Sequence, residues 1–275
     1  MSRPFISFLT DFGPDGPAPI CRGVMLGIAP DANIVDVGHS ITKYAIAEGA
    51  YLLASAVPYL PVGVHVAVVD PGVGTERLPV GIRTTRGDIL IGPDNGLLMP
   101  AAEALGGAVE ARALENKELM LPRTSSTFHG RDIFSPVAAH LSIGTPFENV
   151  GSEIPVGRLV NLQPPEPEVA DGELKTAVLY IDSFGNVRFS AQPADLARAI
   201  GQLEVGKRVL VELDRNGAGK LTERTTWEQT FGRVKLGQSL LFEDSLGRVS
   251  LADNQANAAM RLGATVGTTA RIRAG

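Results

Sequence analysis

Four strand-like apolar runs in the sequence each end in an acidic or amide side chain next to glycine or proline. The four segments are Leu9-Thr10-Asp11-Phe12-Gly13, Val68-Val69-Asp70-Pro71-Gly72, Ile91-Gly92-Pro93-Asp94-Asn95-Gly96 and Tyr180-Ile181-Asp182-Ser183-Phe184-Gly185. Asp before Gly or Pro is also an ordinary turn former, and this simpler interpretation applies to each segment taken singly. In open α/β sheets, however, ligands bind outside the carboxyl ends of the strands. The recurrence therefore predicts that Asp11, Asp70 and Asn95 surround one crevice.

Other polar positions suggest which chemistry such a crevice could perform. A carboxylate such as Asp11 or Asp182 can accept hydrogen bonds from the vicinal hydroxyls of a ribose. His129 lies in a polar, glycine-containing segment, Thr127–Asp132, and is the best candidate for a general acid or base. The segment 72–77 is only a weak match to the dinucleotide fingerprint, because Arg77 stands at its third glycine position.

Two common kinds of catalytic site are not indicated. The four histidines have no HExxH arrangement and no close spacing, so we expect no protein-bound metal. The Gly-x-Ser-x-Gly motif of a nucleophilic serine is also absent from the sequence.

The elements that must position these side chains alternate between strands and helices in the first half of the chain. Apolar runs predict strands over Phe5–Thr10, Ile34–Val37 and Val64–Val69. Helical spacing predicts helices over Ile20–Ile28 and Ala45–Val57, each stopped by a following proline. Strands buried on both faces favour an α/β fold with a mostly parallel sheet flanked by helices.

A second domain is predicted after a segment rich in proline and charge. We expect an α/β domain over residues 1–163, a linker over 164–171 and a second domain, which includes Asp182, over 172–275. Short runs separated by Gly, Asn and Asp turns predict a C-terminal antiparallel β-barrel or a sandwich there. These runs are Thr176–Ile181, Arg208–Leu213, Ser239–Phe242, Arg248–Leu251 and Thr268–Ile272.

The composition of the chain limits the kinds of partner that the protein is expected to have. Of the 275 residues, 44% are hydrophobic and 20% are charged, which is typical of a globular protein. The net charge of −5 and the lack of a Lys/Arg-rich run argue against nucleic acid as a partner. The single cysteine, Cys21, has no partner for an internal disulfide. No secretory leader and no run of about 18 apolar residues is found, so we expect a cytoplasmic protein without a membrane partner.

Taken together, eight segments, in order over nearly the whole chain, resemble the S-adenosyl-L-methionine (SAM) hydroxide adenosyltransferases. These SAM hydrolases are related to the fluorinase and chlorinase that make 5′-halo-adenosines. The segments are Leu9–Gly13, Ile34–His39, Glu48–Ala50, Val69–Thr75, Gly92–Leu98, Thr127–Asp132, Ile181–Val187 and Asp244–Gly247.

The resemblance implies an N-terminal α/β domain, a C-terminal β-barrel domain and a homotrimer with active sites between subunits. It implies that Asp11 and Asp182 bind the ribose hydroxyls and that Tyr44 packs against the sugar or the base. It further assigns to the substrate Asn95, Phe184, Asn186, Phe231 and Ser245. Phe231 would stack on adenine, and Asn186 would read the base edge. Ser245 would lie near the methionine end. Ordinary barrel core is the alternative for Phe184 and Phe231.

Within the family, this chain resembles the hydrolases rather than the halogenases. The resemblance implies that Asp70, Arg77 and His129 surround the attacking water, whereas the halogenases carry an aromatic residue in place of Asp70. A carboxylate would repel a halide but can accept a proton from water. The reaction would give adenosine and L-methionine, with SAM as the substrate and no cofactor. Arg77 could instead be a surface ion-pair partner of Glu76 or Asp88.

Two other functions remain open at this point: a 5′-halo-adenosine synthase, and a SAM or adenosine sensor that binds without turnover. The sequence also departs from the family pattern in the loop 14–19, which is rich in proline and one residue shorter. We therefore expect the contacts to the methionine end of the substrate to differ here.

Overall fold

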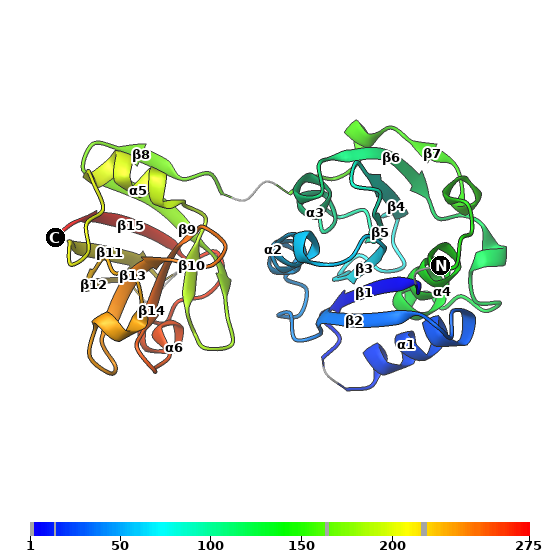
Figure 1. The fold of residues 1–275 in the computed structure, drawn as a ribbon, viewed down its shortest axis with the longest axis horizontal. Helices are drawn as coiled ribbons and strands as arrows, with labels where there is room; N and C mark the ends of the chain where they lie inside the picture. The colour runs from blue at the N-terminus through cyan, green and yellow to red at the C-terminus, as the bar shows by residue number, and fades with distance from the viewer. Residues whose placement is uncertain (1–2, 14, 163–164, 216–218) are drawn as a thin grey trace. The chain divides into compact units, whose positions relative to one another are not determined.

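The chain folds into two compact units, Met1–Leu162 and Gln163–Gly275 (Figure 1). The structure is a computed structural model that describes residues 3–13, 15–162, 165–215 and 219–275. Pro14 of the proline-rich loop and residues 163–164 lie outside the described residues. In the described part of the chain, no helix combines the length and the apolar character needed to cross a membrane.

The first unit is built on a seven-stranded sheet in the order β2-β1-β3-β5-β4-β6-β7. Its strands are β1 (Phe5–Thr10), β2 (Asn33–Gly38), β3 (Val64–Val68), β4 (Pro79–Thr84), β5 (Ile89–Pro93), β6 (Ala108–Ala113) and β7 (Glu153–Ile154). Neighbours among β2, β1, β3 and β5 pair in parallel. The remaining pairs, β4–β5, β4–β6 and β6–β7, are antiparallel. A tight turn joins β4 to β5, so these two strands form a hairpin. The α/β prediction is confirmed, although the sheet is more mixed than expected.

Helices cover both faces of this sheet (Figure 1). On one face α1 (Pro17–Ile28) packs with α4 (Ser135–Ser142), and on the other α2 (Ile46–Ala56) packs with α3 (Met99–Ala104). Two hydrophobic clusters, one on each side, fill the space between helices and sheet. Short 3-10 helices are η1 (Val57–Tyr59), η2 (Lys117–Leu119), η4 (Phe147–Val150) and η5 (Val156–Arg158).

A π-helix, η3 (Gly130–Phe134), leads directly into α4. The polar segment that carries His129 is therefore a loop only up to that residue, and His129 lies at the N-terminal end of a helical segment. Single-turn π-helices of this kind occur frequently at functional sites.

The second unit is an antiparallel sheet of eight strands that closes almost into a barrel, as predicted. Along the main path the order is β12-β11-β15-β9-β10-β14-β13. The strands are β8 (Glu168–Ala170), β9 (Glu173–Ile181), β10 (Val187–Phe189), β11 (Arg208–Asp214), β12 (Lys220–Thr226), β13 (Ser239–Glu243), β14 (Val249–Asp253) and β15 (Thr269–Ala274). Trp227, directly after β12, forms a bridge to Leu241 in β13, so the two ends of the sheet approach each other.

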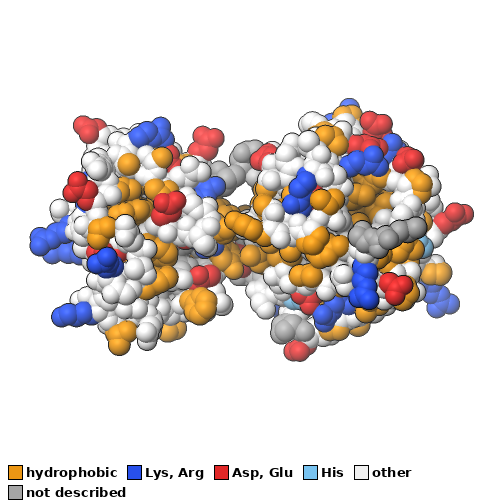
Figure 2. Space-filling view, in the orientation of Figure 1, with side chains coloured by type: hydrophobic (Ala, Val, Ile, Leu, Met, Phe, Trp, Pro, Cys, Tyr) orange, Lys and Arg blue, Asp and Glu red, His pale blue; other side chains and the backbone are white. Residues whose placement is uncertain are grey.

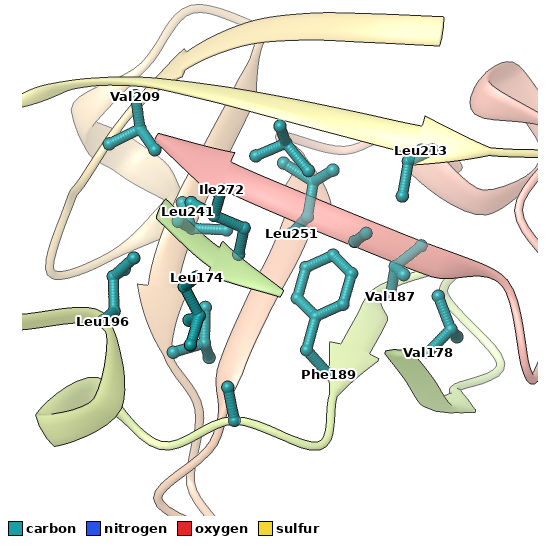
Figure 3. Packing of buried hydrophobic residues seen from close by; sticks show 14 of the residues in the cluster. Leu174, Val178, Val187, Phe189, Leu196, Val209, Leu213, Leu241, Leu251 and Ile272 are labelled. Atoms are coloured by element: carbon teal, nitrogen blue, oxygen red, sulfur yellow. The ribbon is translucent and has the colours of Figure 1, made fainter. Parts of the chain in front are cut away.

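The interior of this barrel is apolar. Figure 3 shows Leu174, Val187, Phe189, Leu251 and Ile272, contributed by the four strands β9, β10, β14 and β15, packed together. The helices α5 (Pro193–Ile200) and α6 (Ala258–Leu262) and the 3-10 helix η6 (Phe231–Arg233) lie between the strands in sequence. Buried residues of α5 and α6 join the same cluster, so the second unit has a core of its own.

The segment expected to be a linker, residues 164–171, contains a strand. Residues Glu168–Ala170 form β8, which pairs antiparallel with β9. All three of its residues are exposed, so the strand depends on backbone pairing rather than on burial. The surface shown in Figure 2 carries interspersed acidic and basic side chains on both units, in keeping with the net charge of −5.

Candidate active site

A cavity of about 250 Å³ lies in the first unit, near the carboxyl ends of β1 and β3. Its polar lining residues are Asp11, Lys43, Tyr44, Asp70, Thr127 and His129. Asp11 directly follows β1, and Asp70 follows β3 by two residues. Because these two strands are parallel neighbours, their carboxyl ends deliver both carboxylates to one edge of the sheet. The structure thus brings Asp11, Tyr44, Asp70 and His129 together.

Arg77 links Asp70 to His129. Its Nε donates to both carboxylate oxygens of Asp70 at 3.0 Å, and its Nη2 donates to Oδ2 at 2.5 Å. The same Nη2 donates to Nδ1 of His129 at 2.8 Å. The Asp70 and Arg77 side chains are only 5% and 9% exposed. Charge-assisted bonds of this type hold both partners in one orientation.

The carboxylate that pairs with Arg77 is Asp70, rather than Glu76 or Asp88. Asp88 pairs instead with Arg86, whose Nε lies 2.7 Å from its Oδ2. The alternative of a surface ion pair with Glu76 or Asp88 is therefore wrong for Arg77.

The partners of His129 determine its protonation. A guanidinium can only donate hydrogen bonds, so Nδ1 of His129 must accept, and the ring proton must sit on Nε2. Burial and the positive charge of Arg77 lower the pKa of His129, whereas Asp70 and Asp132 raise it to a smaller extent. His129 is therefore neutral near pH 7 and retains Nε2–H as its one hydrogen-bond donor.

Two glycines allow the loops around the cavity to touch. Gly74 has φ +76°, and a Cβ placed on it would lie 2.4 Å from the carbonyl oxygen of Ser126. A Cβ on Gly130 would lie 2.9 Å from the ring of Phe12. The loop that carries Asp70 and Arg77 thus packs by its backbone against the loop that carries His129, which in turn packs against Phe12 beside Asp11.

Asp11 also fixes the turn that carries Tyr44. The backbone N–H of Tyr44 donates to Oδ2 of Asp11 at 2.9 Å. Tyr44 has φ +70°, which is uncommon for a residue other than glycine. The carboxylate of Asp11 therefore has one oxygen engaged in holding this turn.

The second unit contains a hollow of about 720 Å³. Phe184, Asn186 and Phe231 line it, together with the segment 253–257, which begins at the last residue of β14. Phe184 is 76% exposed and Phe231 is 38% exposed, so barrel core is the wrong interpretation for both. Phe231 packs edge-on against Phe242, with ring centroids 5.0 Å apart.

Asp182 lies next to this hollow and shapes its wall. Its Oδ1 accepts the backbone N–H groups of Phe184 and Asn186, both at 3.0 Å. Its Oδ2 accepts from the amide Nδ2 of Asn186 at 2.8 Å. Asp182 is thus a turn former, as the simpler interpretation states, and the same bonds present Phe184 and Asn186 to the hollow.

Two predicted residues lie apart from both hollows. Both polar groups of the Asn95 side chain are bonded within the first unit. Its Nδ2 donates at 2.9 Å to the carbonyl of Val69, in the loop that follows β3, and its Oδ1 accepts from the N–H of Leu97 in its own loop at 3.2 Å. Ser245 is exposed in the turn after β13. Neither of them lines the cavity or the hollow.

Two sets of lining residues escaped the sequence-based search. The segment 253–257 carries the same signal as the other sites, a polar run at a strand end, and could have been found by it. Lys43 carries no such signal, because a single exposed lysine has no pattern. Among the residues that the structure describes, no three His, Cys, Asp or Glu side chains are grouped so as to hold a metal ion.

Comparisons with known proteins cover both units. Residues 6–151 match the family model described as SAM hydroxide adenosyltransferase N-terminal domain, and residues 176–271 match the corresponding C-terminal domain model. The chain is 41% identical, over 100% of its length and 99% of the relative, to a (R)-S-adenosyl-L-methionine hydrolase of Salinispora arenicola. It is 36% identical to the enzyme of that name from Thermus thermophilus, over 97% of this chain and 98% of the relative.

A fluorinase and a solved structure are also similar. The fluorinase of an Actinoplanes species is 29% identical, over 98% of this chain and 97% of the relative. The crystal structure of an uncharacterized conserved protein from Thermotoga maritima is 32% identical, with a TM-score of 0.88, over 98% of this chain and 99% of that one.

Proposed function

The chain belongs to the SAM hydroxide adenosyltransferase family, and from this premise we propose that it hydrolyses SAM to adenosine and L-methionine. The observation that carries this proposal is the Asp70–Arg77–His129 network beside the cavity. A buried carboxylate paired with arginine disfavours a halide but suits a polarised water molecule. The greater identity to the hydrolases than to the fluorinase supports the same reaction.

The hydrogen-bond pattern assigns roles in the attack. Among the described residues, only Arg77 Nε donates to Oδ1 of Asp70. A water molecule at the network can therefore donate to this oxygen and can accept from Nε2–H of His129. Its oxygen attacks C5′, the C5′–S bond breaks, and the sulfonium leaves as the neutral thioether of methionine. The water proton passes to Asp70, since Nδ1 of His129 is already occupied, and Arg77 stabilises the developing hydroxide.

The low polarity of a closed site favours this reaction. Sulfonium and incipient hydroxide have opposite charges that cancel as the new bond forms, so a dry environment stabilises the transition state relative to the reactants. The reaction needs no cofactor, because SAM itself supplies the leaving group.

For the substrate, we assign the ribose hydroxyls to Asp11 and Asp182 and the sugar or base to Tyr44. Adenine is assigned to the hollow of the second unit, where Phe184 and Phe231 offer aromatic faces and Asn186 offers an amide. Because these residues are divided between the two units, we also assign the complete site to a homotrimer in which subunits share sites. Asn95 and Ser245 are left out, since neither lines either hollow.

Hydrolysis in ¹⁸O-labelled water tests the proposal. The purified protein is incubated with SAM, and the products are analysed by mass spectrometry. We expect methionine and adenosine that carries the label at O5′. Unlabelled adenosine, or no adenosine, would overturn the hydrolase assignment. Halide-dependent formation of 5′-halo-adenosine would indicate the synthase, and tight SAM binding without product would indicate the sensor.

A further inference from the structure

Lys43 contributes an unpaired positive charge to the wall of the cavity. Its side chain lines the cavity together with Asp11, Tyr44 and Asp70. Its ammonium group makes no hydrogen bond and no ion pair with any residue in the described part of the chain. On these grounds, and resting on the proposed function, we propose that Lys43 binds the α-carboxylate of the amino-acid part of SAM.

The backbone around Lys43 is built as a constrained turn. The N–H of Ala45 donates to the carbonyl of Thr42 at 2.9 Å, so Lys43 and Tyr44 are the two central residues of a β-turn. Tyr44, with φ +70°, occupies a position where such a turn favours glycine. The bond from its N–H to Asp11 holds this strained conformation in place.

Strain of this kind is retained mainly where the side chains have a function. Glycine would relieve the strain at position 44 but would remove the tyrosine ring from the cavity wall. The same turn that presents Tyr44 also presents Lys43, so the pair forms one recognition element at the cavity.

Charge chemistry determines which part of SAM can meet Lys43. SAM carries two cations, the sulfonium and the α-ammonium, and one anion, the α-carboxylate. An ammonium group attracts only the carboxylate among these and repels the other two. The methionine end is also where the sequence departs from the family pattern, so an unusual contact is expected there.

The other cations at the site are not available for this role. The guanidinium of Arg77 is engaged by Asp70. The described residues that line the hollow of the second unit include Asp253 but no lysine or arginine. Lys43 is thus the one free cation found on the described walls of the cavity and the hollow.

The test compares two ligands that differ only in the carboxylate, with Lys43→Gln as the variant. KM and kcat are measured for SAM, and the inhibition constant of decarboxylated SAM is measured as a competitor. We expect Lys43→Gln to raise KM for SAM about tenfold, because a charge-assisted hydrogen bond is lost. In Lys43→Gln, kcat for SAM and the inhibition constant of decarboxylated SAM should each change less than about twofold. The variant Lys43→Arg keeps the positive charge and should retain most of the affinity for SAM.

Lys117→Gln is the matched control, because Lys117 is exposed in the same unit and does not line the cavity. An unchanged KM for SAM in Lys43→Gln would overturn the inference, as would an equal loss of affinity for both ligands. A fall in kcat alone would instead place Lys43 near the attacking water and would also overturn it. If the wild-type protein does not hydrolyse SAM, the proposed function fails before the variants are compared.

Discussion

At the scale of single residues, His129 provides a test of the hydrogen-bond network through pH. Its neutral form accepts the bond from Arg77 at Nδ1, whereas the protonated ring would direct an N–H at the guanidinium and break that bond. Because burial and Arg77 lower the pKa of His129 below its usual 6.5, the neutral form persists to a lower pH than for an ordinary histidine. We expect kcat/KM to be level at neutral pH and to fall with acid only below about pH 6.5.

His129→Gln should lose this acid limb, and its kcat should fall about 100-fold, as is typical when a positioned acid–base group is removed. The measurement is the pH dependence of kcat/KM for the wild type and the variant. His140→Gln, in helix α4, serves as the histidine control and should keep the wild-type profile. An acid limb that stays in place in His129→Gln would show that another group titrates.

Patterns of residues in the sequence predicted the part of the site that follows strands and missed the part that depends on contacts between distant loops. Asp11 and Asp70 could be found because each comes directly after, or close after, an apolar run that the sequence predicts as a parallel strand. The carboxyl ends of parallel strands lie at one edge of the sheet, so the two side chains are expected there. The bond between Arg77 and His129 spans two loops far apart in sequence, and no spacing rule predicts it. The polar segment alone made His129 an acid–base candidate, whereas the role of Arg77 and its grouping with His129 came only from the family resemblance. Lys43 was missed because the two observations that single it out, its place on the cavity wall and its lack of a partner among the described residues, are visible only in the structure.

At the scale of elements, two loops that pack closely at Gly74 hold the Asp70–Arg77–His129 network, which we propose to be catalytic. The Gly74→Ala variant places a methyl group 2.4 Å from the carbonyl oxygen of Ser126. This distance is too short, so one of the two backbones must move away. Since Arg77 and His129 lie on opposite sides of this contact, their hydrogen bond should lengthen. We expect kcat to fall about 100-fold, because misplacement by about 1 Å has this effect, while KM for SAM changes little.

Gly107→Ala is the matched control for this prediction. Gly107 also has a positive φ, +100°, but a Cβ there would meet no atom within 4 Å. The control therefore carries the same kind of backbone strain without the steric contact. Both variants should lose some thermal stability, and only Gly74→Ala should lose kcat. Equal effects of the two variants on kcat would show that the loop contact has no role in the reaction.

The elements themselves were predictable where burial dictates them. β1 and β3 are continuous apolar runs, and their bounds follow from the sequence almost residue by residue. β8 was missed, because its three exposed residues are held by pairing with β9 and show no apolar pattern. The π-helix at Gly130 was missed as well, since it begins within a polar segment and is stabilised by the buried Ile133 and Phe134 that follow.

At the scale of the whole molecule, each unit has a core and a hollow of its own, and the proposed substrate contacts are divided between them. The Asp70–Arg77–His129 network, proposed to be catalytic, belongs to the first unit, and the proposed adenine contacts belong to the second. Composition indicated neither fact, because it is averaged over both units. A homotrimer with shared sites would explain why an enzyme for one small substrate needs both units.

Complementation between inactive subunits tests this assembly. Asp70→Asn removes the carboxylate that holds Arg77, and the double variant Phe184→Ala/Phe231→Ala removes the aromatic faces proposed to stack on adenine. Each variant alone should be nearly inactive. When the two are co-expressed in equal amounts, random assembly into shared sites leaves about one site in four with both halves intact, so about a quarter of the wild-type activity should return. Co-expression of Asp70→Asn with Arg77→Gln, both in the first unit, is the control and should restore nothing. No recovery in the first mixture, with mixed oligomers demonstrated by mass spectrometry, would mean that each chain builds its own site.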